Sequence, residues 1–514
     1  MINLYHYHVA QIFSEAVEEF PDRKALIWDC NNYVIYSDLE RISNQIAHYL
    51  LDIGVKKGDR VCIILDKVTV TYGIILASLK IGTPYFVVDP ANPAARTKYI
   101  IEKCQPSIVF VHHGLNLEDF TGKVVYVNEK QNGFFKDCST DKVNTGWRIT
   151  GSDPAYIMFT SGSTGFPKGV VISHDNLINF IKWSQWRFGF SANDIFTNVN
   201  PLYFDNSVFD IYSSLFCGAA LAPFDSTISK DPYQVMRKID ELQCTVYFSV
   251  PSLLIYFQIL NLFNSQSFKS VKKIIFGGEG YPKSKLKDLY DCLGDRITFY
   301  NVYGPTECTC ICSVYELSET DFTNLEGLPP LGTLTPNFSY LIINENGSLV
   351  DKNEIGELCL SGPCVGLGYF NDPDQTRTLF VQNPLNNAYH ERIYKTGDLV
   401  RYNTDDNKLY FSGRKDSQIK HRGYRIEMAE IEHALTSVPH IDEAVALQSH
   451  ANGISIIIAT VATKQSIGAD YIKSEASRFI PKYMIPEKIE ILEQLPKNAN
   501  GKIDRNLLQT KYCS

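Results

Sequence analysis

The sequence predicts an α/β fold: a large N-terminal domain of βα-built sheets, a β-barrel-like subdomain, and a small α+β domain at the C-terminal end. Short apolar runs alternate with helical patterns along much of the chain, as in parallel sheets that are covered by helices. Residues 325–412 contain short strands between Asn-Gly and Gly turns, which indicates an antiparallel β unit. A chain of 514 residues is also too long for one simple core.

The individual elements follow from local patterns. The first residues, MINLYHYHVAQIFSEAVEEF, have the spacing of an amphipathic helix. Residues 60–90 predict strand, helix and strand, because RVCIIL is apolar, TYGIILASLKIG has helical spacing, and PYFVVD is β-branched and aromatic. Similar alternation recurs at PSIVFVHH, at CTVYFSV, and at VKKIIFGGEG followed by the helical YPKSKLKDLYDCL.

The polar segment GRKDSQIKHRGYR separates two patterns and places a domain boundary near Asp416. Residues 1–415 are then the core domain. Residues 416–514 are the small domain, with a helix at EMAEIEHALTSV and strands at DEAVALQ and ISIIIATVA.

Composition excludes several classes of protein. A net charge of −8 argues against a nucleic-acid or anionic-membrane partner, since either favours a basic face. The sequence shows neither a signal peptide nor an apolar run of about 18 residues, so we expect a cytoplasmic enzyme without a membrane partner. The 13 cysteines are scattered and odd in number, which fits reduced thiols.

The cysteine-rich segment CTCIC is the densest thiol cluster. On a strand, Cys308, Cys310 and Cys312 share one face. Zinc ligands usually come as spaced pairs together with histidine. We therefore expect packing or pocket lining here rather than a metal site.

The strongest local motif is YIMFTSGSTGFPKGVVISH, residues 156–174. An apolar strand leads into TSGSTG, whose hydroxyl and backbone N–H groups can surround an anion, and Lys168 follows as a cation. The spacing differs from G-x-x-x-x-G-K-[ST]. Taken alone, the segment is equally compatible with an ordinary Ser/Gly turn.

Three further segments carry polar residues at turns. NVYGPTECT presents Thr306 and Glu307, and this carboxylate is a candidate Mg²⁺ ligand if a triphosphate binds nearby. YKTGDLVRY presents Asp398, which can accept hydrogen bonds from ribose hydroxyls. LPKNANGKIDR places Lys502 at a loop tip. Each is also compatible with an ordinary surface or turn residue.

In their joint order these segments resemble the adenylate-forming superfamily, which includes the adenylation domains of nonribosomal peptide synthetases, acyl- and aryl-CoA ligases and beetle luciferases. The resemblance extends from about residue 10 to 505. It implies ATP and Mg²⁺ as cofactors, with Glu307 as the metal ligand. The implied nucleotide-binding residues are Thr160, Ser161, Gly162, Ser163, Thr164, Lys168, Gly277, Gly278, Glu279, Asn301, Tyr303, Gly304, Thr306, Asp398, Arg414 and Phe411, the last standing where many relatives carry tyrosine.

The resemblance also assigns roles in the small domain. Lys502 matches the lysine that stabilises the charge growing on the α-phosphate, where no general base is needed because the attacking carboxylate is already ionised. Asp416 matches a hinge about which the small domain moves. Lys420 and Gly423 then lie on the face presented for thiol attack.

Asp205, in PLYFDNSVFDIY, resembles the aspartate that pairs with the α-ammonium of an amino acid; the alternative is a helix-capping aspartate. The pocket positions implied by the resemblance are Asp205, Asn206, Phe209, Phe248, Ile275, Gly277, Val302, Cys310 and Ile311. Apart from Asp205 and Asn206 this wall is apolar. It therefore favours a small or medium apolar amino acid such as proline, valine or isoleucine as the substrate. D-alanine is an alternative substrate.

The chain contains no carrier segment with a phosphopantetheine serine, so the resemblance is to a stand-alone adenylation protein. We expect it to form an aminoacyl-adenylate, release pyrophosphate and load a separate carrier protein. Two alternatives remain: an acyl- or aryl-CoA ligase, and a non-catalytic nucleotide-binding module.

Overall fold

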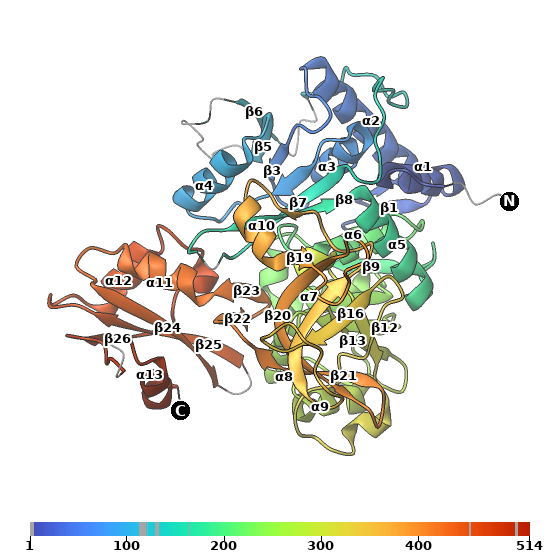
Figure 1. Cartoon of the computed structure of the whole chain (residues 1–514). Helices are drawn as coiled ribbons and strands as arrows, with labels where there is room; N and C mark the ends of the chain where they lie inside the picture. Colours follow the sequence, from blue (N-terminus) through green and yellow to red (C-terminus); the bar gives the residue numbers. More distant parts are fainter. Residues whose placement is uncertain are drawn as a thin grey trace.

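Two large sheets lie at the centre of the computed structural model (Figure 1), which describes residues 5–112, 120, 122–128, 133–162, 164–451, 454–498 and 502–513. The first sheet has seven strands; those from β7 to β6 are parallel, and β8 and β18 are added antiparallel at the other edge. Its order is β18 (Gly368–Tyr369), β8 (Lys168–Ser173), β7 (Pro154–Thr160), β4 (Tyr85–Val87), β3 (Val61–Ile64), β5 (Ile108–His112) and β6 (Lys123–Val127). The strand–helix–strand pattern predicted for residues 60–90 is confirmed.

The second sheet has nine strands, parallel in the middle and antiparallel at both ends. Its order is β15 (Thr333–Leu334), β14 (Ser313–Glu316), β13 (Thr298–Tyr303), β12 (Lys273–Gly277), β11 (Val246–Ser249), β9 (Ile195–Asn198), β10 (Ala220–Pro223), β1 (Lys24–Ile27) and β2 (Tyr33–Ile35). The N-terminal β1 thus joins a sheet formed mainly by residues far along the chain.

Helices cover both sheets and fill the space between them. The helix α5 packs on β7 and β8, α6 packs on β9, β10 and β11, and the two helices contact each other. The helices of this part are α1 (Val9–Glu19), α2 (Tyr36–Asp52), α3 (Thr69–Ile81), α4 (Ala94–Cys104), α5 (His174–Phe188), α6 (Asn206–Ser214), α7 (Pro232–Glu241), α8 (Pro251–Ile259), α9 (Lys283–Leu293) and α10 (Pro373–Leu379). The predicted N-terminal amphipathic helix is α1.

The β-rich region is an antiparallel sheet of five strands. These are β16 (Ser339–Ile343), β17 (Ile355–Ser361), β19 (Phe380–Gln382), β20 (Arg392–Asn403) and β21 (Lys408–Arg414). The long β20 pairs with β17 along one edge, and with β19 and then β21 along the other. Among the described residues the sheet does not close, because its end strands do not pair, so it is an open sheet rather than a barrel.

The small domain contains a hairpin, a three-stranded sheet and three helices. Its elements are β22 (Gln418–His421), β23 (Tyr424–Glu427), α11 (Met428–Thr436), β24 (Glu443–Ala451), β25 (Ile454–Ala462), α12 (Ala469–Ala476), β26 (Lys488–Leu492) and α13 (Arg505–Tyr512). Two apolar clusters in this part draw all their members from residues 419–513. We therefore propose the domain boundary at Asp416.

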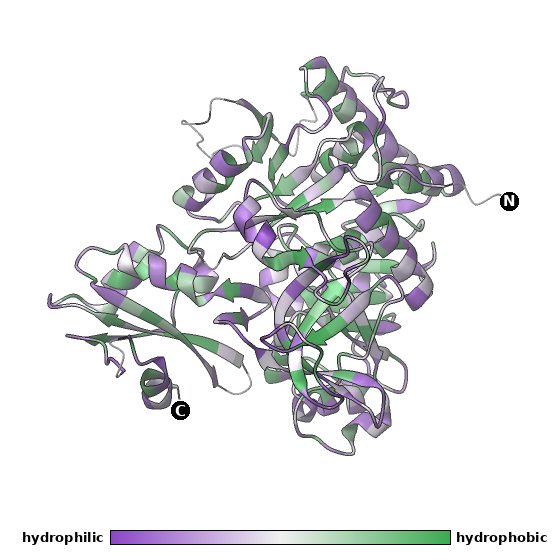
Figure 2. Cartoon of the chain, in the orientation of Figure 1, coloured by the Kyte–Doolittle hydropathy of each residue, from purple (hydrophilic) through white to green (hydrophobic). Residues whose placement is uncertain are grey.

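The hydrophobic core lies mainly on the strands and the helix faces against them, as the green segments of Figure 2 show. One cluster joins the two large sheets through α5 and α6. Glycine ends several helices; the φ of +71° at Gly82, which follows α3, is a conformation that favours this residue. No helix in the described part of the chain is long and apolar enough to cross a bilayer.

Candidate active site

The predicted phosphate-binding loop joins β7 and β8 in a tight hairpin. Thr160 and Lys168 pair directly across it. A Cβ atom at Gly162 would lie 1.9 Å from the carbonyl oxygen of Phe166, so only glycine fits there. The buried hydroxyl oxygen of Thr160 has no hydrogen-bond partner among the described residues. This orphaned group is available to a ligand at the loop.

Lys168 and Glu307 meet at the base of this loop. Their Nζ and Oε1 atoms are 3.8 Å apart, and the hydroxyl of Tyr369 donates to the same Oε1 at 2.7 Å. Arg425 of the small domain reaches Oε2 of Glu307 at 2.7 Å. Burial alone would raise the pKa of Glu307, but the Arg425 and Lys168 cations outweigh it and hold that pKa at about 2. Burial lowers the pKa of Lys168 to about 8, and Arg425 adds to this effect.

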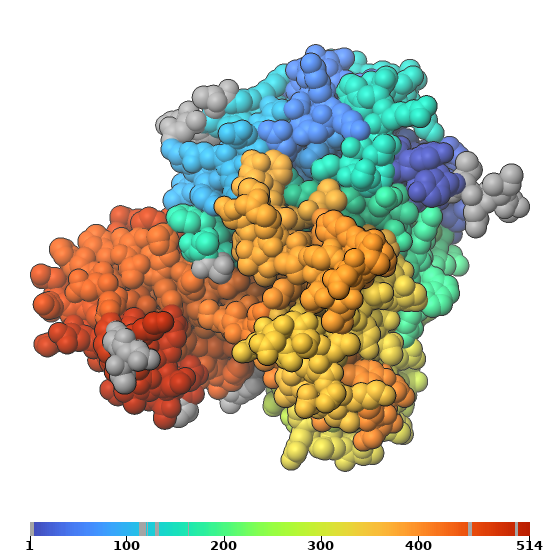
Figure 3. All heavy atoms as spheres, viewed as in Figure 1, coloured from blue at the N-terminus to red at the C-terminus, as the bar shows by residue number. Residues whose placement is uncertain are grey.

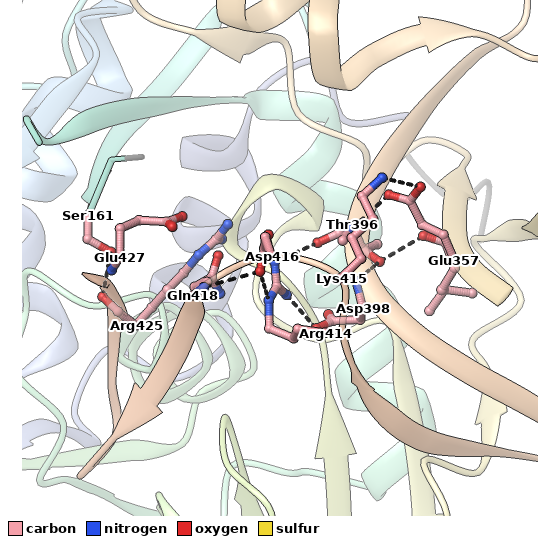
Figure 4. A network of polar contacts seen from close by, with 12 residues as sticks. Ser161, Glu357, Thr396, Asp398, Arg414, Lys415, Asp416, Gln418, Arg425 and Glu427 are labelled. Atoms are coloured by element: carbon pink, nitrogen blue, oxygen red, sulfur yellow. Dashed lines mark hydrogen bonds and ion pairs between the residues drawn. The ribbon is translucent and has the colours of Figure 1, made fainter. Parts of the chain in front are cut away.

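A second polar network surrounds Asp398 on β20 (Figure 4). The hydroxyl of Tyr303 donates to Asp398 Oδ2 at 2.6 Å, and Arg414 forms an ion pair with Oδ1. Arg414 also donates to both carboxylate oxygens of Asp416, at 2.7 and 2.6 Å. The predicted ribose contact and the predicted hinge residue are thus joined by one guanidinium. Phe411 does not line the pocket, because its ring packs against the core instead.

The predicted adenine strip follows β12. Gly277 must be small, because a Cβ atom there would lie 2.3 Å from the carbonyl oxygen of Val302. Gly278 has a φ of +85° and lines the pocket. Glu279 accepts a hydrogen bond from the backbone N–H of Gly423 at 2.6 Å.

The neighbouring strand β13 and the turn after it supply the other side of this site. The Asn301 side chain donates to the Pro330 carbonyl at 2.8 Å and does not line the pocket. Gly304 does line it, and a Cβ atom at this position would lie 2.3 Å from the carbonyl oxygen of Cys310.

Asp205 is not a helix cap. It directly precedes α6, but its side chain makes no capping hydrogen bond. Its carboxylate lines the pocket and accepts a hydrogen bond from the Thr306 hydroxyl at 2.6 Å. Burial raises the pKa of Asp205, while the Thr306 hydrogen bond and the Arg425 charge oppose that rise. No ion pair engages this carboxylate within the described ranges.

Most of the predicted amino-acid pocket comes together. The lining residues among those predicted are Asp205, Asn206, Phe248, Val302, Cys310 and Ile311. Phe209 lies one helical turn along α6, in the layer behind: its ring centroid is 4.8 Å from that of Phe248. Ile275 is fully buried in the core, and Gly277 lies beside Val302. These last three positions shape the wall without reaching the cavity surface.

The CTCIC segment is not a strand, so the alternation that a strand would give does not apply. Cys308 ends the 3₁₀ turn η2 (Thr306–Cys308), and Thr309 and Cys310 have φ values of +58° and +74°. This left-handed turn carries Cys310 into the pocket wall, while Cys308 and Cys312 are buried in the core. No cluster with metal-binding geometry exists among the described residues. The cysteines pack in the core, and Cys310 also lines the pocket.

The β22–β23 hairpin of the small domain is inserted into the site. Arg422 and Gly423 form its turn, with φ values of +51° and +84°. The ammonium of Lys420 lies 5.7 Å from the centroid of the Tyr303 ring, and burial lowers the pKa of Lys420 while Asp398 opposes this. About 60 Å³ of the pocket is free in this arrangement.

The hairpin also occupies the phosphate-binding loop (Figure 4). The Ser161 hydroxyl donates to the carbonyl of Arg425 at 2.7 Å and accepts from the N–H of Glu427 at 3.1 Å. Thr164 is exposed, and Ser163 lies outside the described residues. The small domain therefore uses a group that was predicted to bind phosphate.

The structure does not bring the predicted site residue Lys502 to the site. Its side chain is exposed, and it lines neither the pocket nor the neighbouring cavity. It directly precedes the segment that leads into α13, which Figure 1 shows in the small domain, separate from the large sheets.

A second cavity, of about 990 Å³, lies beside the pocket, with walls from both domains. The large domain contributes apolar residues such as Leu202, Phe204 and Val250, and the small domain contributes Tyr424 and Tyr483. Figure 3 shows how the small domain, in red and orange, adjoins the large one. Two residues, Asn206 and Gly423, line both the cavity and the pocket.

Arg425 and Tyr369 were not anticipated from the sequence, although both bind Glu307. Arg425 pairs directly with Lys420 across the β22–β23 hairpin, and residues opposite each other in an antiparallel pair share a face, so the prediction for Lys420 could have indicated it. Tyr369 pairs through the short strand β18, and no local pattern indicated its contact with Glu307.

Two family matches cover most of the chain. Residues 13–370 match the family described as AMP-binding enzyme, and residues 430–502 match the AMP-binding enzyme C-terminal domain. The L-proline--[L-prolyl-carrier protein] ligase of Pseudomonas fluorescens is 32% identical over 503 residues, covering 95% of this chain and 96% of that protein.

Large multidomain synthases are similar as well. Surfactin synthase subunit 3 of Bacillus subtilis is 31% identical over 96% of this chain, and tyrocidine synthase 1 of Brevibacillus parabrevis is 31% identical over 97%. The chain spans only 38% and 44% of their lengths. The solved structure of NpsA-ThdA, an artificially fused adenylation-PCP di-domain from Klebsiella oxytoca, aligns with a TM-score of 0.80 and 25% identity, over 95% of this chain and 94% of that one.

Proposed function

Because the chain belongs to the AMP-binding enzyme family, we propose that it is a ligase that activates an amino acid with ATP. The products of the first step are an aminoacyl-adenylate and pyrophosphate. In the second step the aminoacyl group passes to the phosphopantetheine thiol of a separate carrier protein. The L-proline--[L-prolyl-carrier protein] ligase, of which the chain covers 96%, is named for this activity on proline.

The observation that carries the amino-acid part is the carboxylate of Asp205. It is buried at the pocket, is held by Thr306 and lacks a cationic partner within the described residues. A buried carboxylate without a counter-ion is costly, and an α-ammonium of the substrate would remove that cost. A fatty or aryl acid brings no such cation.

The phosphate-binding loop and Lys168 are suited to the triphosphate. Mg²⁺ prefers oxygen ligands and is often held by one or two carboxylates together with substrate phosphates. Glu307 provides such a carboxylate beside Lys168, so the residues present fit an ATP-bound Mg²⁺. When bound, Mg²⁺ would offset negative charge on the phosphates. Arg425 must first leave Glu307, which requires the small domain to move.

The side-chain specificity follows from the pocket wall. Phe248, Val302 and Ile311 are apolar, Cys310 is a weak hydrogen-bonding group, and Phe209 fills the space behind Phe248. A charged side chain would meet no partner there. We therefore propose a small or medium apolar amino acid, such as proline, valine or isoleucine.

Features at the interface between the two domains support the second step. Lys420 and Gly423 face the pocket, and the cavity of about 990 Å³ leads to it from the domain interface. Its apolar walls suit an extended arm that delivers a thiol. The arrangement of the small domain seen here therefore matches the acceptor step, and the first step requires another arrangement that brings Lys502 to the phosphates.

Amino-acid-dependent exchange of labelled pyrophosphate into ATP tests the proposal. The full-length protein is assayed with each of the twenty amino acids, D-alanine, and representative fatty and aryl acids. We expect exchange with one or a few small apolar amino acids. Exchange confined to fatty or aryl acids would favour a CoA ligase, and no exchange with any acid would favour a nucleotide-binding module.

The variant Asp205→Asn tests the carboxylate directly. Loss of one partner from a buried charge pair typically costs about 3–5 kcal/mol, or a factor of about 10² to several times 10³. We expect a loss of that size in kcat/KM for the amino acid, with ATP binding measured by calorimetry retained. Near-normal exchange by this variant would remove the basis for an amino-acid substrate.

A further inference from the structure

The junction between the reaction pocket and the second cavity is formed by one residue from each domain. Gly423 contributes only backbone, whereas Asn206 contributes a side-chain amide. Any group that passes from the cavity to the pocket must therefore pass this amide. Asn206 is the first residue of α6, next to Asp205, so a rigid helix fixes its position.

The amide of Asn206 is uncommitted. Its side chain forms no hydrogen bond with another residue in the part of the chain that the structure describes, and it is half-buried. Most of its surroundings cannot substitute for a polar partner: Phe248 and Val302 belong to the pocket, and Leu202 and Val250 to the cavity. A half-buried amide with one donor group and one acceptor group gains from a ligand that offers both.

The acceptor proposed above offers such a group. In a pantetheine arm a short ethylene spacer separates the thiol from the first amide. When the sulfur is beside the acyl carbon in the pocket, that amide lies just behind it, toward the cavity. We propose that Asn206 hydrogen-bonds this first amide of the acceptor and so positions the thiol for attack. This inference rests on the proposed function.

The step itself is a simple acyl transfer. The sulfur forms a bond to the carbonyl carbon, the bond between that carbon and the AMP oxygen breaks, and AMP leaves with the electron pair. The thiol proton passes to solvent. Asn206 takes no part in the bond changes; it is a positioning residue, and its contribution depends on an amide next to the thiol.

The test compares two acceptor thiols. Pantetheine carries the amide, and 2-mercaptoethanol does not. Thioester formation is followed by mass spectrometry with saturating ATP and the amino acid that supports exchange in the unaltered enzyme. Because Asn206 also lines the amino-acid pocket, both transfers are measured from the adenylate already formed on the enzyme, and the readout is their ratio. For Asn206→Leu, which keeps similar bulk, we expect the rate of transfer to pantetheine relative to 2-mercaptoethanol to fall about tenfold, the effect of one lost hydrogen bond.

Three variants complete the design. Asn506→Leu makes the same change at an exposed position of α13 and should alter neither reaction. Asn206→Gln, which retains an amide, should recover part of the transfer to pantetheine. If Asn206→Leu does not fold, as judged by circular dichroism, Asn206→Ala carries the test.

Other outcomes overturn the inference. Equal losses with both thiols, which leave the ratio unchanged, would show that the residue acts through shape or on the amino acid and not on the amide of the acceptor. Unchanged transfer to pantetheine would also refute it. A complete lack of exchange by the unaltered enzyme would instead refute the proposed function, and this assignment with it.

Discussion

At the scale of single residues, the contact between Asp205 and Thr306 decides whether the pocket holds a charged carboxylate. Burial raises the pKa of Asp205, and the hydroxyl of Thr306 opposes that rise because it donates to the ionised form. Only the ionised carboxylate can pair with an ammonium. Lowering the pH through the pKa of Asp205 therefore weakens amino-acid binding.

The variant Thr306→Val should raise this pKa further. We expect the acidic limb of kcat/KM for the amino acid, measured at saturating ATP, to move to higher pH by about one unit. Thr306→Ser keeps the hydroxyl and should restore the original midpoint. An unchanged midpoint in Thr306→Val would show that the hydrogen bond does not control the ionisation of Asp205.

Many of the site residues could be predicted, because the motifs place side chains of the expected chemistry in a fixed order along the chain. The contacts between these side chains could not be predicted. Thr306 lies 101 positions from Asp205 along the chain, and no local pattern reports such a pairing. Phe209 and Ile275 illustrate the same limit: being near the pocket does not decide whether a side chain reaches its surface or stands behind a neighbour.

At the scale of elements, the conformation of the β22–β23 hairpin bears on the proposed second step. Gly423 has a φ of +84°, and a Cβ atom there would lie 2.8 Å from Val250. Both the backbone conformation and the contact disfavour any side chain. The strain applies to the arrangement in which the hairpin enters the site.

We therefore expect Gly423→Ala to slow thioester formation about 10- to 100-fold, the effect of about 1–3 kcal/mol of strain, and to leave pyrophosphate exchange within about threefold. Gly468→Ala is a matched control, because nothing lies within 4 Å of a Cβ atom at this small-domain glycine. Equal slowing of both reactions by Gly423→Ala would contradict a role confined to the second step.

The helices and the parallel strands were predictable from periodicity, while the CTCIC turn was not. Thr309 and Cys310 adopt positive φ without glycine, and composition does not reveal such turns. The order of strands was also inaccessible, because β1 pairs with β10, which lies almost two hundred residues later. Such pairings depend on the packing of the whole chain.

At the scale of the whole molecule, the position of Lys502 implies two arrangements of the small domain. The resemblance assigns this residue to the first step, yet it is exposed here and lines neither cavity. Lys502→Ala should reduce pyrophosphate exchange about 10²- to 10³-fold, as expected for removal of a charge-stabilising group. Transfer from chemically prepared aminoacyl-adenylate to pantetheine should remain within about threefold. A comparable loss in this transfer would contradict a role restricted to adenylation.

The ion pair between Arg425 and Glu307 links the same two arrangements to Mg²⁺. The guanidinium engages the carboxylate that we propose as the Mg²⁺ ligand of the first step, and both groups are largely withdrawn from solvent. Under this proposal, small-domain insertion and Mg²⁺–ATP binding compete for Glu307. Because the pair holds the pKa of Glu307 at about 2, the carboxylate stays ionised at all physiological pH values, so proton binding does not control this exchange.

The variant Arg425→Ala should shift the competition for Glu307 toward Mg²⁺–ATP binding. Without the guanidinium, Glu307 in the inserted arrangement keeps, among the described residues, only Lys168 and the Tyr369 hydroxyl, and the loss of one partner from a buried ion pair costs about 3 kcal/mol; we expect thioester formation to fall about 100-fold. Pyrophosphate exchange should persist and reach half its maximum at a lower Mg²⁺ concentration, because Mg²⁺ no longer displaces a cation. Titration of exchange against MgCl₂ measures this. An unchanged Mg²⁺ requirement together with normal thioester formation would show that Arg425 is not the group that exchanges with the metal. The small domain would then have to be held in place by its other contacts, such as those of Ser161 with the hairpin.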